Sequence, residues 1–239
     1  MTRTAFTRRE IEVRRMFDRL SGRYDLMNRL ISLGQDRRWR RALLKRAGFS
    51  RIAARQGRVL DVGTGTGRIP METLGPYPGL RVTGADFSPG MIHQGKSGCP
   101  DPRISWCSAD ALQLPFREAT FDAVTSAYLM RNVSDPKCAF EEQFRVVKPG
   151  GVVACLETSP PSRSLLYPLV RFHLRKVIPF LGRIISREAG AYTYLPDTTQ
   201  GFVTPEGLAA IMARAGLEQV SYQEFMFGVM AIHVGRRPP

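Results

Sequence analysis

Apolar residues recur at helical spacing in the first part of the chain. Two groups of positions follow the pattern of a single helix face: Val13, Met16, Phe17 and Leu20, then Trp39, Leu43 and Ala47. The second group stops before Gly48, and glycine commonly ends helices. The run from Tyr24 to Asn28 lies between the two groups. Residues 1–56 are therefore predicted to form a helical cap.

Short apolar runs replace this pattern from residue 57 onwards. Five of them alternate with segments that suit helices: residues 58–62, 80–85, 104–107, 121–126 and 151–156. A turn at Lys148–Gly151 precedes the fifth run. Alternation of strands and helices predicts an α/β fold, with a mostly parallel sheet and helices on both of its faces.

The end of the chain departs from this alternation. Residues 159–200 carry a broad apolar face that several prolines interrupt, which predicts a helical lid. Residues 205–239 contain a helix from Glu206 to Ala215 and two strand-like runs. We therefore expect one domain over residues 57–239, with an insertion at about 159–200 before the last strands.

Basic residues outnumber acidic ones, and the excess is concentrated near the N-terminus. The net charge is +14, and residues 1–58 contribute 17 Lys and Arg against five Asp and Glu. Such a segment can face nucleic acid, an anionic membrane surface or an anionic substrate, and an arginine-rich composition alone also explains it.

Composition excludes several classes of protein. Hydrophobic residues make up 43% of the chain, which argues against intrinsic disorder. No run approaches the roughly 18 apolar residues of a membrane span, and no signal peptide is visible. The four cysteines form no Cys-x-x-Cys pair and the three histidines are isolated. No metal site is predicted, and a cytoplasmic location with reduced thiols fits best.

The candidate chemistry begins where the first predicted strand ends. Asp61 is followed there by three alternating glycines, at Gly63, Gly65 and Gly67. A dinucleotide-binding motif would require a further glycine at position 68, which is Arg68.

Two further acids follow the next two predicted strands. Asp86 stands where a carboxylate can hold the hydroxyls of a ribose. Asp110, with Ala111 beside it, can accept a hydrogen bond from an adenine amine. Because nothing in this pattern gathers a pyrophosphate, S-adenosylmethionine fits better than NAD.

Other segments follow in a recognisable order along nearly the whole chain. They are Met16–Asn28, Ser32–Gly34 and Arg37–Arg40; Leu114–Phe116, Phe121–Val124 and Arg131–Val133; and Ala191–Leu195 with Ala231–Gly235. Together with the glycine turn, they resemble the class I S-adenosylmethionine-dependent methyltransferases, and among these the ubiquinone/menaquinone C-methyltransferases. The resemblance implies a Rossmann-like fold and methyl transfer to a ring carbon of a prenylated quinol. Demethylmenaquinol is preferred as acceptor over the benzoquinol of ubiquinone synthesis.

The resemblance also implies roles for individual residues. The expected donor-binding positions are Thr66, Asp86, Phe87, Asp110, Ala111 and Ser126, in addition to Asp61, Gly63, Gly65 and Gly67. A ring carbon becomes nucleophilic when a ring hydroxyl loses its proton. Arg131 is the candidate that stabilises the resulting charge, Asn132 the candidate that orients the acceptor, and Tyr24 a second-rank candidate beside Asp25.

A prenylated acceptor would be dissolved in a bilayer. We therefore expect a peripheral contact with the anionic inner face of a membrane, through the arginine-rich N-terminal region and the segment 169–181. No nucleic-acid partner is expected, and the sequence is compatible with an oligomer.

Three departures from the family pattern keep other readings open. Arg68 stands where the family usually has an acid, Leu129 where it has glycine, and Pro196 where it has serine. Another small-molecule methyltransferase, acting for example on a phenol or a sterol, would share the donor site. A non-catalytic scaffold that binds the donor is the alternative from a different class. A nucleic-acid methyltransferase is disfavoured, because no Asn/Asp-Pro-Pro-Tyr loop follows the fourth strand.

Overall fold

The computed structural model describes residues 7–22, 24–160, 198–199 and 201–239. The strands are β1 Arg58–Val62, β2 Arg81–Asp86, β3 Ile104–Ser108, β4 Phe121–Ala127, β5 Val147–Thr158, β6 Glu218–Phe225 and β7 Met230–Arg236. The described helices are α1 Arg8–Leu20, α2 Tyr24–Ile31, α3 Asp36–Arg46, α4 Phe49–Ala53, α5 Arg68–Thr73, α6 Pro89–Gly98, α7 Pro136–Val146 and α11 Pro205–Arg214. None of these helices is long and apolar enough to cross a membrane.

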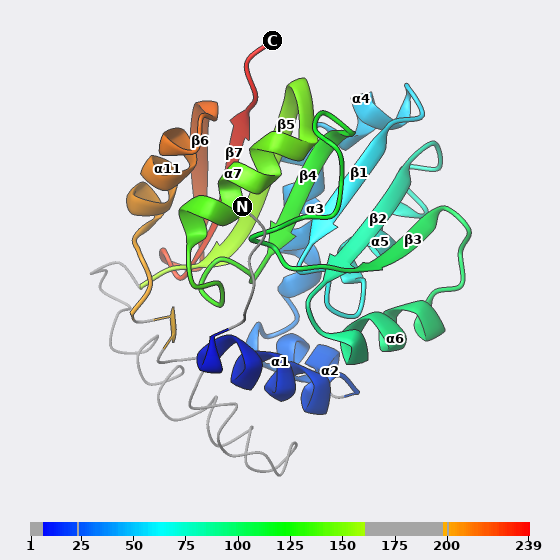
Figure 1. Ribbon diagram of the computed structural model, residues 1–239, viewed down its shortest axis with the longest axis vertical. Helices are drawn as coiled ribbons and strands as arrows, with labels where there is room; N and C mark the ends of the chain where they lie inside the picture. The colour runs from blue at the N-terminus through cyan, green and yellow to red at the C-terminus, as the bar shows by residue number, and fades with distance from the viewer. Residues whose placement is uncertain (1–6, 23, 161–197, 200) are drawn as a thin grey trace.

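The strands form a seven-stranded sheet in the order β3-β2-β1-β4-β5-β7-β6 (Figure 1). The first five run parallel, and β7 pairs antiparallel with both β5 and β6. The predicted α/β fold with a mostly parallel sheet is confirmed. The strand order reverses direction between β1 and β4, and in such sheets ligands bind at the carboxyl ends of the strands beside this point.

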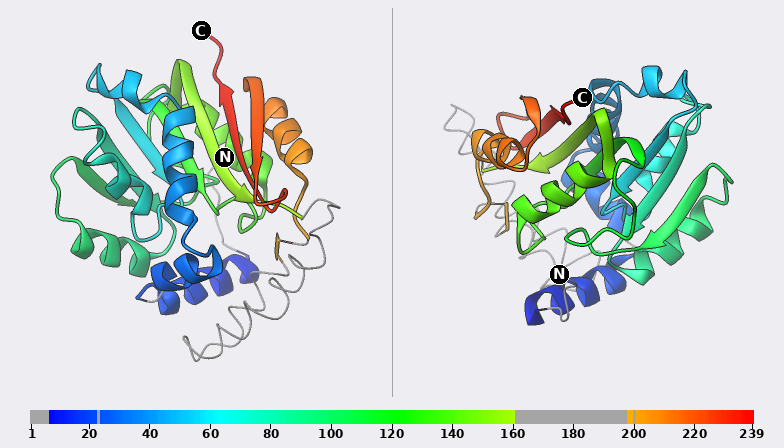
Figure 2. Two further views of the ribbon diagram at one scale, coloured as in Figure 1. Left: turned by 180° about the vertical axis from the view of Figure 1, so that it is seen from behind. Right: turned by 45° about the horizontal axis from the view of Figure 1, so that its top comes forward.

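Helices cover both faces of the sheet (Figures 1 and 2). On one face α3 packs its buried Trp39, Leu43 and Leu44 against β1, β5 and β7. On the other face α7 and α11 bury residues such as Phe140 and Met212. Apolar burial on both faces is what the continuous hydrophobic runs of the parallel strands require.

The fifth strand begins earlier than the sequence pattern predicts. The expected turn at Lys148–Gly151 lies inside β5, where the register with β4 shifts between Phe121 and Ala123. Gly150 has φ +73°, a left-handed conformation that glycine adopts without steric cost. The segment is therefore an irregularity within a paired strand.

The N-terminal residues divide between two places. The run from Tyr24 to Asn28, which lies between the predicted helices, begins the helix α2. Helices α1 and α2 lie at the carboxyl ends of the parallel strands, whereas α3 lies against the face of the sheet (Figures 1 and 2). We refer to α1 and α2 together as the cover. The predicted lid over 159–200, including the apolar segment 169–181, falls almost wholly outside the described residues.

Candidate active site

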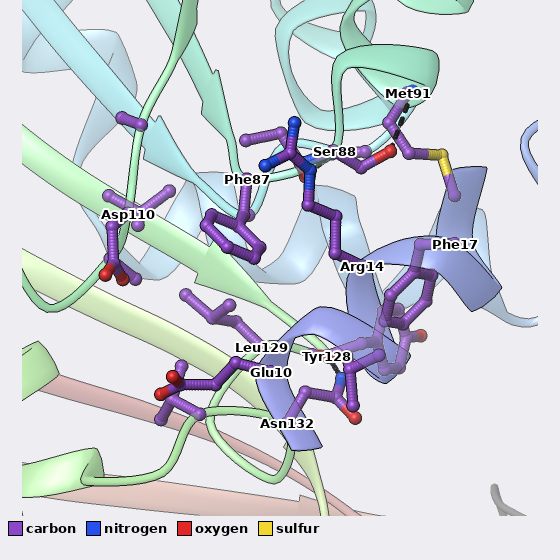
Figure 3. A pocket seen from close by; sticks show the side chains of 18 of the residues that line it. Glu10, Arg14, Phe17, Phe87, Ser88, Met91, Asp110, Tyr128, Leu129 and Asn132 are labelled. Carbon is purple, nitrogen blue, oxygen red and sulfur yellow. Dashed lines mark hydrogen bonds between the residues drawn. The ribbon is translucent and has the colours of Figure 1, made fainter. Parts of the chain in front are cut away.

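A pocket lies between the cover and the carboxyl ends of β1, β2, β3 and β4 (Figure 3). About 830 Å³ of space free of protein atoms lies within the pocket and its mouth, open solvent included. Among the predicted donor-binding and catalytic residues, those that line it are Tyr24, Gly63, Gly65, Asp86, Phe87, Asp110, Ala111 and Asn132. The predicted residues thus converge from five separate segments of the chain.

The glycine turn forms the floor beside β1. Gly63 has φ +68°, and a Cβ there would come 2.9 Å from Leu129 Cδ1, so a larger residue would collide with the opposite wall. Gly67 has φ +82°, and a Cβ there would lie 2.2 Å from the ring of Trp106. Gly63 therefore keeps the pocket open, whereas Gly67 allows the turn to pack on β3.

Asp86 fixes the geometry of the second strand end. Its Oδ2 accepts a hydrogen bond from the Gly65 backbone N–H at 2.7 Å, and its Oδ1 accepts from the Ser88 N–H at 2.8 Å. Burial raises the pKa of this carboxyl, and the two backbone donors oppose the rise. Each oxygen keeps a lone pair for a further donor, which suits a ribose with two adjacent hydroxyls.

The neighbouring wall suits a flat aromatic ring. Phe87 points into the pocket, and the Arg14 guanidinium lies 5.1 Å from the centre of its ring (Figure 3). On the far side Asp110 accepts a hydrogen bond from the Leu112 N–H at 3.0 Å, next to Ala111. An apolar slot with a carboxylate at its edge is the arrangement that an adenine with an exocyclic amine requires.

The opposite half of the pocket is formed by the segment after β4 and by α2. Tyr128 adopts φ +58°, and its carbonyl accepts a hydrogen bond from Asn132 Nδ2 at 2.8 Å. Tyr24 packs its ring edge-on against Phe17, with 5.9 Å between the ring centres. Burial raises the pKa of the Tyr24 hydroxyl, although the charge of Arg131 opposes this. This half offers aromatic faces, an amide and a phenol.

Arg131 does not line the pocket. It is buried, and its Nη1 forms an ion pair with Glu157, itself buried at the end of β5. The guanidinium lies 5.5 Å from the centre of the Tyr128 ring. Its charge is thus largely balanced by Glu157, and its direct contact is with the wall of the pocket.

Four more of the predicted residues lie behind the pocket lining: Asp61, Thr66, Gly67 and Ser126. Asp61 is buried and accepts a hydrogen bond from Thr125 Oγ1 at 2.7 Å. Burial raises the pKa of this carboxyl to about 7. The Thr66 hydroxyl donates to Asp25 of the cover at 2.8 Å. These residues support the loops that form the pocket.

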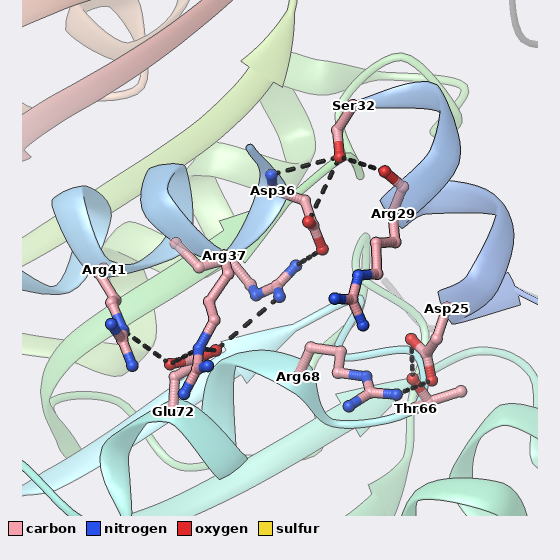
Figure 4. Close-up of polar contacts among 10 residues, drawn as sticks. Asp25, Arg29, Ser32, Asp36, Arg37, Arg41, Thr66, Arg68 and Glu72 are labelled. Carbon is pink, nitrogen blue, oxygen red and sulfur yellow. Dashed lines mark hydrogen bonds and ion pairs between the residues drawn. The ribbon is translucent and has the colours of Figure 1, made fainter. Parts of the chain in front are cut away.

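The cover is held to the pocket loops by acidic side chains. Asp25 accepts a hydrogen bond from the Thr66 hydroxyl and also pairs with the guanidinium of Arg68 (Figure 4). In this ion pair Arg68 Nη2 lies 2.7 Å from Asp25 Oδ2. Asp18 accepts hydrogen bonds from the Ser88 hydroxyl and from the Gly90 N–H at the start of α6. Glu10 accepts a hydrogen bond from the Ser134 hydroxyl at 2.7 Å. Three loops that carry pocket residues are therefore each tied to α1 or α2.

A second polar cluster orients the start of α3. Asp36 accepts hydrogen bonds from Ser32 and from Arg40 Nη1, the latter at 2.8 Å. The hydrogen bonds and charge of Arg40 hold the pKa of Asp36 below its usual value, against the effect of burial. Arg37 and Arg41 pair with Glu72 of α5 (Figure 4). Part of the basic N-terminal charge is therefore balanced locally.

Comparison with known proteins identifies the family. The sequence profile of the ubiE/COQ5 methyltransferase family matches residues 5–237. The chain belongs to this family. It is an S-adenosylmethionine-dependent methyltransferase, and the resemblance seen in the sequence is confirmed.

Curated relatives cover almost the whole methyltransferase. The ubiquinone/menaquinone biosynthesis C-methyltransferase UbiE of Desulfotalea psychrophila is 44% identical, over 93% of this chain and 89% of its own. The demethylmenaquinone methyltransferase of Thermus thermophilus is 43% identical, over 93% of this chain and 100% of its own.

Solved structures share the fold. An S-adenosylmethionine-dependent methyltransferase of Thermotoga maritima has a TM-score of 0.60 at 19% identity, and covers 94% of this chain and 99% of its own. A Haloferax volcanii methyltransferase, solved with the activator Trm112, has a TM-score of 0.64 at 19% identity, over 93% of this chain and 98% of its own.

The pocket of this methyltransferase fits its donor. Asp86 presents two carboxylate oxygens, as a ribose with adjacent hydroxyls would require, and Asp110 with Ala111 edges an apolar slot that would suit an adenine. Sequence reasoning did not single out Glu10, Arg14 and Phe17 of α1, which line the pocket. Glu10 and Arg14 bear no sequence signal that distinguishes them from ordinary solvent-facing residues of an amphipathic helix. Phe17 belongs to the apolar face that predicted the helix.

Proposed function

We propose that this methyltransferase transfers the methyl group of S-adenosylmethionine to a ring carbon of a prenylated quinol, converting demethylmenaquinol to menaquinol. The observation that supports the proposal best is the division of the pocket. Donor-fitting acids, Asp86 and Asp110, lie on one side, and an aromatic and amide wall lies on the other. Relatives such as the Thermus thermophilus demethylmenaquinone methyltransferase support the choice of acceptor.

When bound, S-adenosylmethionine supplies a methyl group that is activated by its sulfonium. The protein then has to align the acceptor carbon with that methyl and the departing sulfur. A bond forms from the ring carbon to the methyl, the carbon–sulfur bond breaks, and the ring carbon later loses its proton. Tyr24 and Tyr128 would confine the flat quinol ring, and Asn132 would orient its oxygen.

In this proposal the aromatic and amide side of the pocket also activates the quinol. Deprotonation of a ring hydroxyl makes the neighbouring carbon nucleophilic, and nearby donors stabilise the resulting anion. In this proposal Asn132, which lies in the pocket lining, faces that oxygen. Arg131 does not contact the acceptor in this proposal. Its ion pair with Glu157 and its contact with the Tyr128 ring fix the position of the wall that Tyr128 forms.

The donor site has its own proposed members. Gly63, Gly65, Asp86, Phe87, Asp110 and Ala111 contact the donor directly in this proposal, while Asp61, Thr66, Gly67 and Ser126 support the loops from behind. The acceptor's tail implies in addition a peripheral contact with the anionic cytoplasmic face of a membrane.

A turnover assay tests this function. Wild-type protein is given labelled S-adenosylmethionine with a reduced, short-tailed demethylmenaquinol, or with a demethylated methoxy-benzoquinol. We expect label on the naphthoquinol ring carbon. Label on the benzoquinol alone would move the protein to ubiquinone synthesis, a reaction that the name of the Desulfotalea psychrophila relative also includes. Transfer to neither, with donor binding intact, would contradict the quinol assignment.

A matched pair of variants separates the donor site from general stability. Asp86→Asn removes a partly buried charge that faces the pocket, and hydrogen bonds to charged groups contribute about 1.5–3 kcal/mol. We expect the Kd for S-adenosylmethionine to rise about ten- to a hundredfold. Asp122→Asn makes the same change at the amino end of β4, where the carboxylate meets Lys148 and the Arg58 N–H. The Kd of this control should stay within about twofold, since Asp122 lies outside the pocket lining.

A further inference from the structure

Exposed apolar side chains gather at one end of the molecule. In the described part of the chain, the large hydrophobic residues that remain exposed are Ile11, Leu26, Leu33, Tyr222 and Phe227. Ile11 and Leu26 belong to α1 and α2, and Leu33, with 67% of its surface exposed, follows in the turn before α3. Three of the five therefore lie on or beside the cover.

The outward side of α1 is also basic. Arg8, Ile11, Arg15 and Arg19 recur every three or four residues and so share a helix face. All four are exposed. Leu26 is exposed on α2, and Leu33, in the turn that follows this helix, is exposed as well. We call the set Arg8, Ile11, Arg15, Arg19, Leu26 and Leu33 the outer face of the cover.

The acids of the cover point away from this face. Glu10, Asp18 and Asp25 are turned inward, where they hold the loops of the pocket. Among the described residues of α1, Glu12 is the acid that remains on the outer side, and it pairs with Arg8 at 3.1 Å. Because most acidic side chains of the cover point towards the pocket loops, its outer face consists of arginines and exposed leucine and isoleucine side chains.

The opposite end of the sheet differs in this respect. Arginines are present there too, but several are paired with acids, as Arg103 is with Asp101 and Arg237 with Glu118. None of the five exposed large apolar residues lies in the loops at that end. Arginines are thus common to both ends, and their combination with exposed apolar side chains distinguishes the cover.

We propose that the outer face of the cover docks on an anionic lipid bilayer. Apolar side chains flanked by arginine suit the headgroup boundary, where the side chain enters the acyl region and the guanidinium binds phosphate. The proposal rests on the proposed function, because a prenylated acceptor is what brings this enzyme to a bilayer. The inner side of the same two helices lines the pocket, so docking would place its mouth near the lipid.

Vesicle co-sedimentation of the full chain tests the surface. The probes are phosphatidylcholine vesicles with and without phosphatidylglycerol, and wild-type protein is expected to bind the anionic vesicles much more tightly. Arg15→Gln/Arg19→Gln should weaken this binding about thirtyfold, because each basic residue near such a surface contributes about 1 kcal/mol. Leu26→Ser/Leu33→Ser should weaken it at least about tenfold.

Matched controls carry the same changes away from the cover. Arg51→Gln/Arg55→Gln removes two exposed arginines at α4, at the other end of the sheet (Figure 1). Tyr222→Ser removes an exposed apolar side chain on β6. Both controls should bind anionic vesicles within about threefold of wild type, a difference worth less than one kcal/mol. Equal losses in the controls and the cover variants would overturn the proposal, as would wild-type binding that does not depend on phosphatidylglycerol.

Two further readouts separate the alternatives. Turnover of a short-tailed acceptor in solution should be unchanged in the cover variants, whereas turnover of a long-tailed acceptor embedded in vesicles should fall with binding. Absence of turnover by wild type in both formats would count against the proposed function and leave the vesicle result standing. Sedimentation that shows a wild-type dimer, converted to monomer by Leu26→Ser/Leu33→Ser, would instead assign the face to a second copy of the chain.

Discussion

The central sheet and the cover over its carboxyl ends are held in place by different forces. The sheet lies between two large clusters of buried apolar residues, one with Phe140 and one with Leu43. The described residues of the cover contribute a small cluster whose buried members are Leu20 and Met27. Its principal ties to the rest of the molecule are hydrogen bonds and ion pairs.

This difference has a functional consequence. Burial of apolar surface depends weakly on salt and pH, so the sheet provides a fixed frame for the strand ends. The ties of the cover end on the same loops that line the pocket, such as the Gly65–Arg68 turn and the start of α6. Opening of the cover and distortion of the donor site are therefore expected to occur together.

The largest effect is expected in the sheet. Phe140→Ala removes a fully buried ring of α7, and such truncations cost about 3–5 kcal/mol of unfolding free energy. Urea unfolding should show this loss, while the folded fraction binds S-adenosylmethionine with unchanged Kd. Leu26→Ala in the cover, where the side chain is half exposed, should change stability by less than about 0.5 kcal/mol. Similar losses of unfolding free energy in the two variants would contradict the difference between the sheet and the cover.

A second prediction concerns pH and the base of the glycine turn. The folded-state pKa of Asp61 is about 7, raised by burial from 3.8. Between about pH 4 and 7 the folded protein holds a proton that the unfolded chain releases, so unfolding free energy falls as pH rises. The stabilisation that comes from the protonated carboxyl is fully present below about pH 4. Above pH 7 it has been lost, which lowers the unfolding free energy by about 4 kcal/mol.

Asp61→Asn tests this by fixing the neutral form. The amide oxygen can still accept the hydrogen bond from Thr125. Urea unfolding near pH 5 and near pH 8 should show a smaller drop in stability for the variant than for wild type. Parallel drops in the two proteins would mean that Asp61 stays ionised throughout.

The fold was predictable because its signals are local. Each parallel strand is a short apolar run closed by a polar residue, as β1 is by the glycine turn and β2 by Asp86. Parallel strands place their carboxyl ends at one edge, so Asp86 and Asp110 could be expected near one another from the sequence pattern alone.

The remainder of the site depends on contacts between distant residues. Arg131 follows a strand end and is followed by Asn132, yet only Asn132 reaches the pocket, because Glu157 draws Arg131 inward. Arg68 departs from the family pattern, and its partner Asp25 lies 43 residues earlier. Periodicity and spacing do not specify such pairings, which arise when the cover folds onto the loops.

A smaller effect is expected when one tie of the cover is weakened. Asp18→Asn replaces the charged acceptor of the Ser88 hydroxyl and the Gly90 N–H, worth about 1–2 kcal/mol at a half-buried site. Native-state hydrogen exchange should become about tenfold faster in α1 and remain unchanged in β4. The Kd for S-adenosylmethionine should rise several-fold, because Ser88 lines the pocket. Uniform acceleration across the sheet would show that the cover does not open by itself.

The smallest effect is predicted for the ion pair between Arg68 and Asp25. About half of the Arg68 side chain is exposed, and such pairs contribute about 0.2–1 kcal/mol. Arg68→Ala should therefore raise the Kd for S-adenosylmethionine by less than about fivefold at low salt, and the difference from wild type should vanish near 1 M salt, where charges are screened within about 3 Å. Thr66→Val provides the comparison, since it removes the uncharged donor to the same carboxylate. The rise in Kd caused by Thr66→Val should persist at high salt. If the rise caused by Arg68→Ala also persisted there, packing and not charge would hold α2 over the donor.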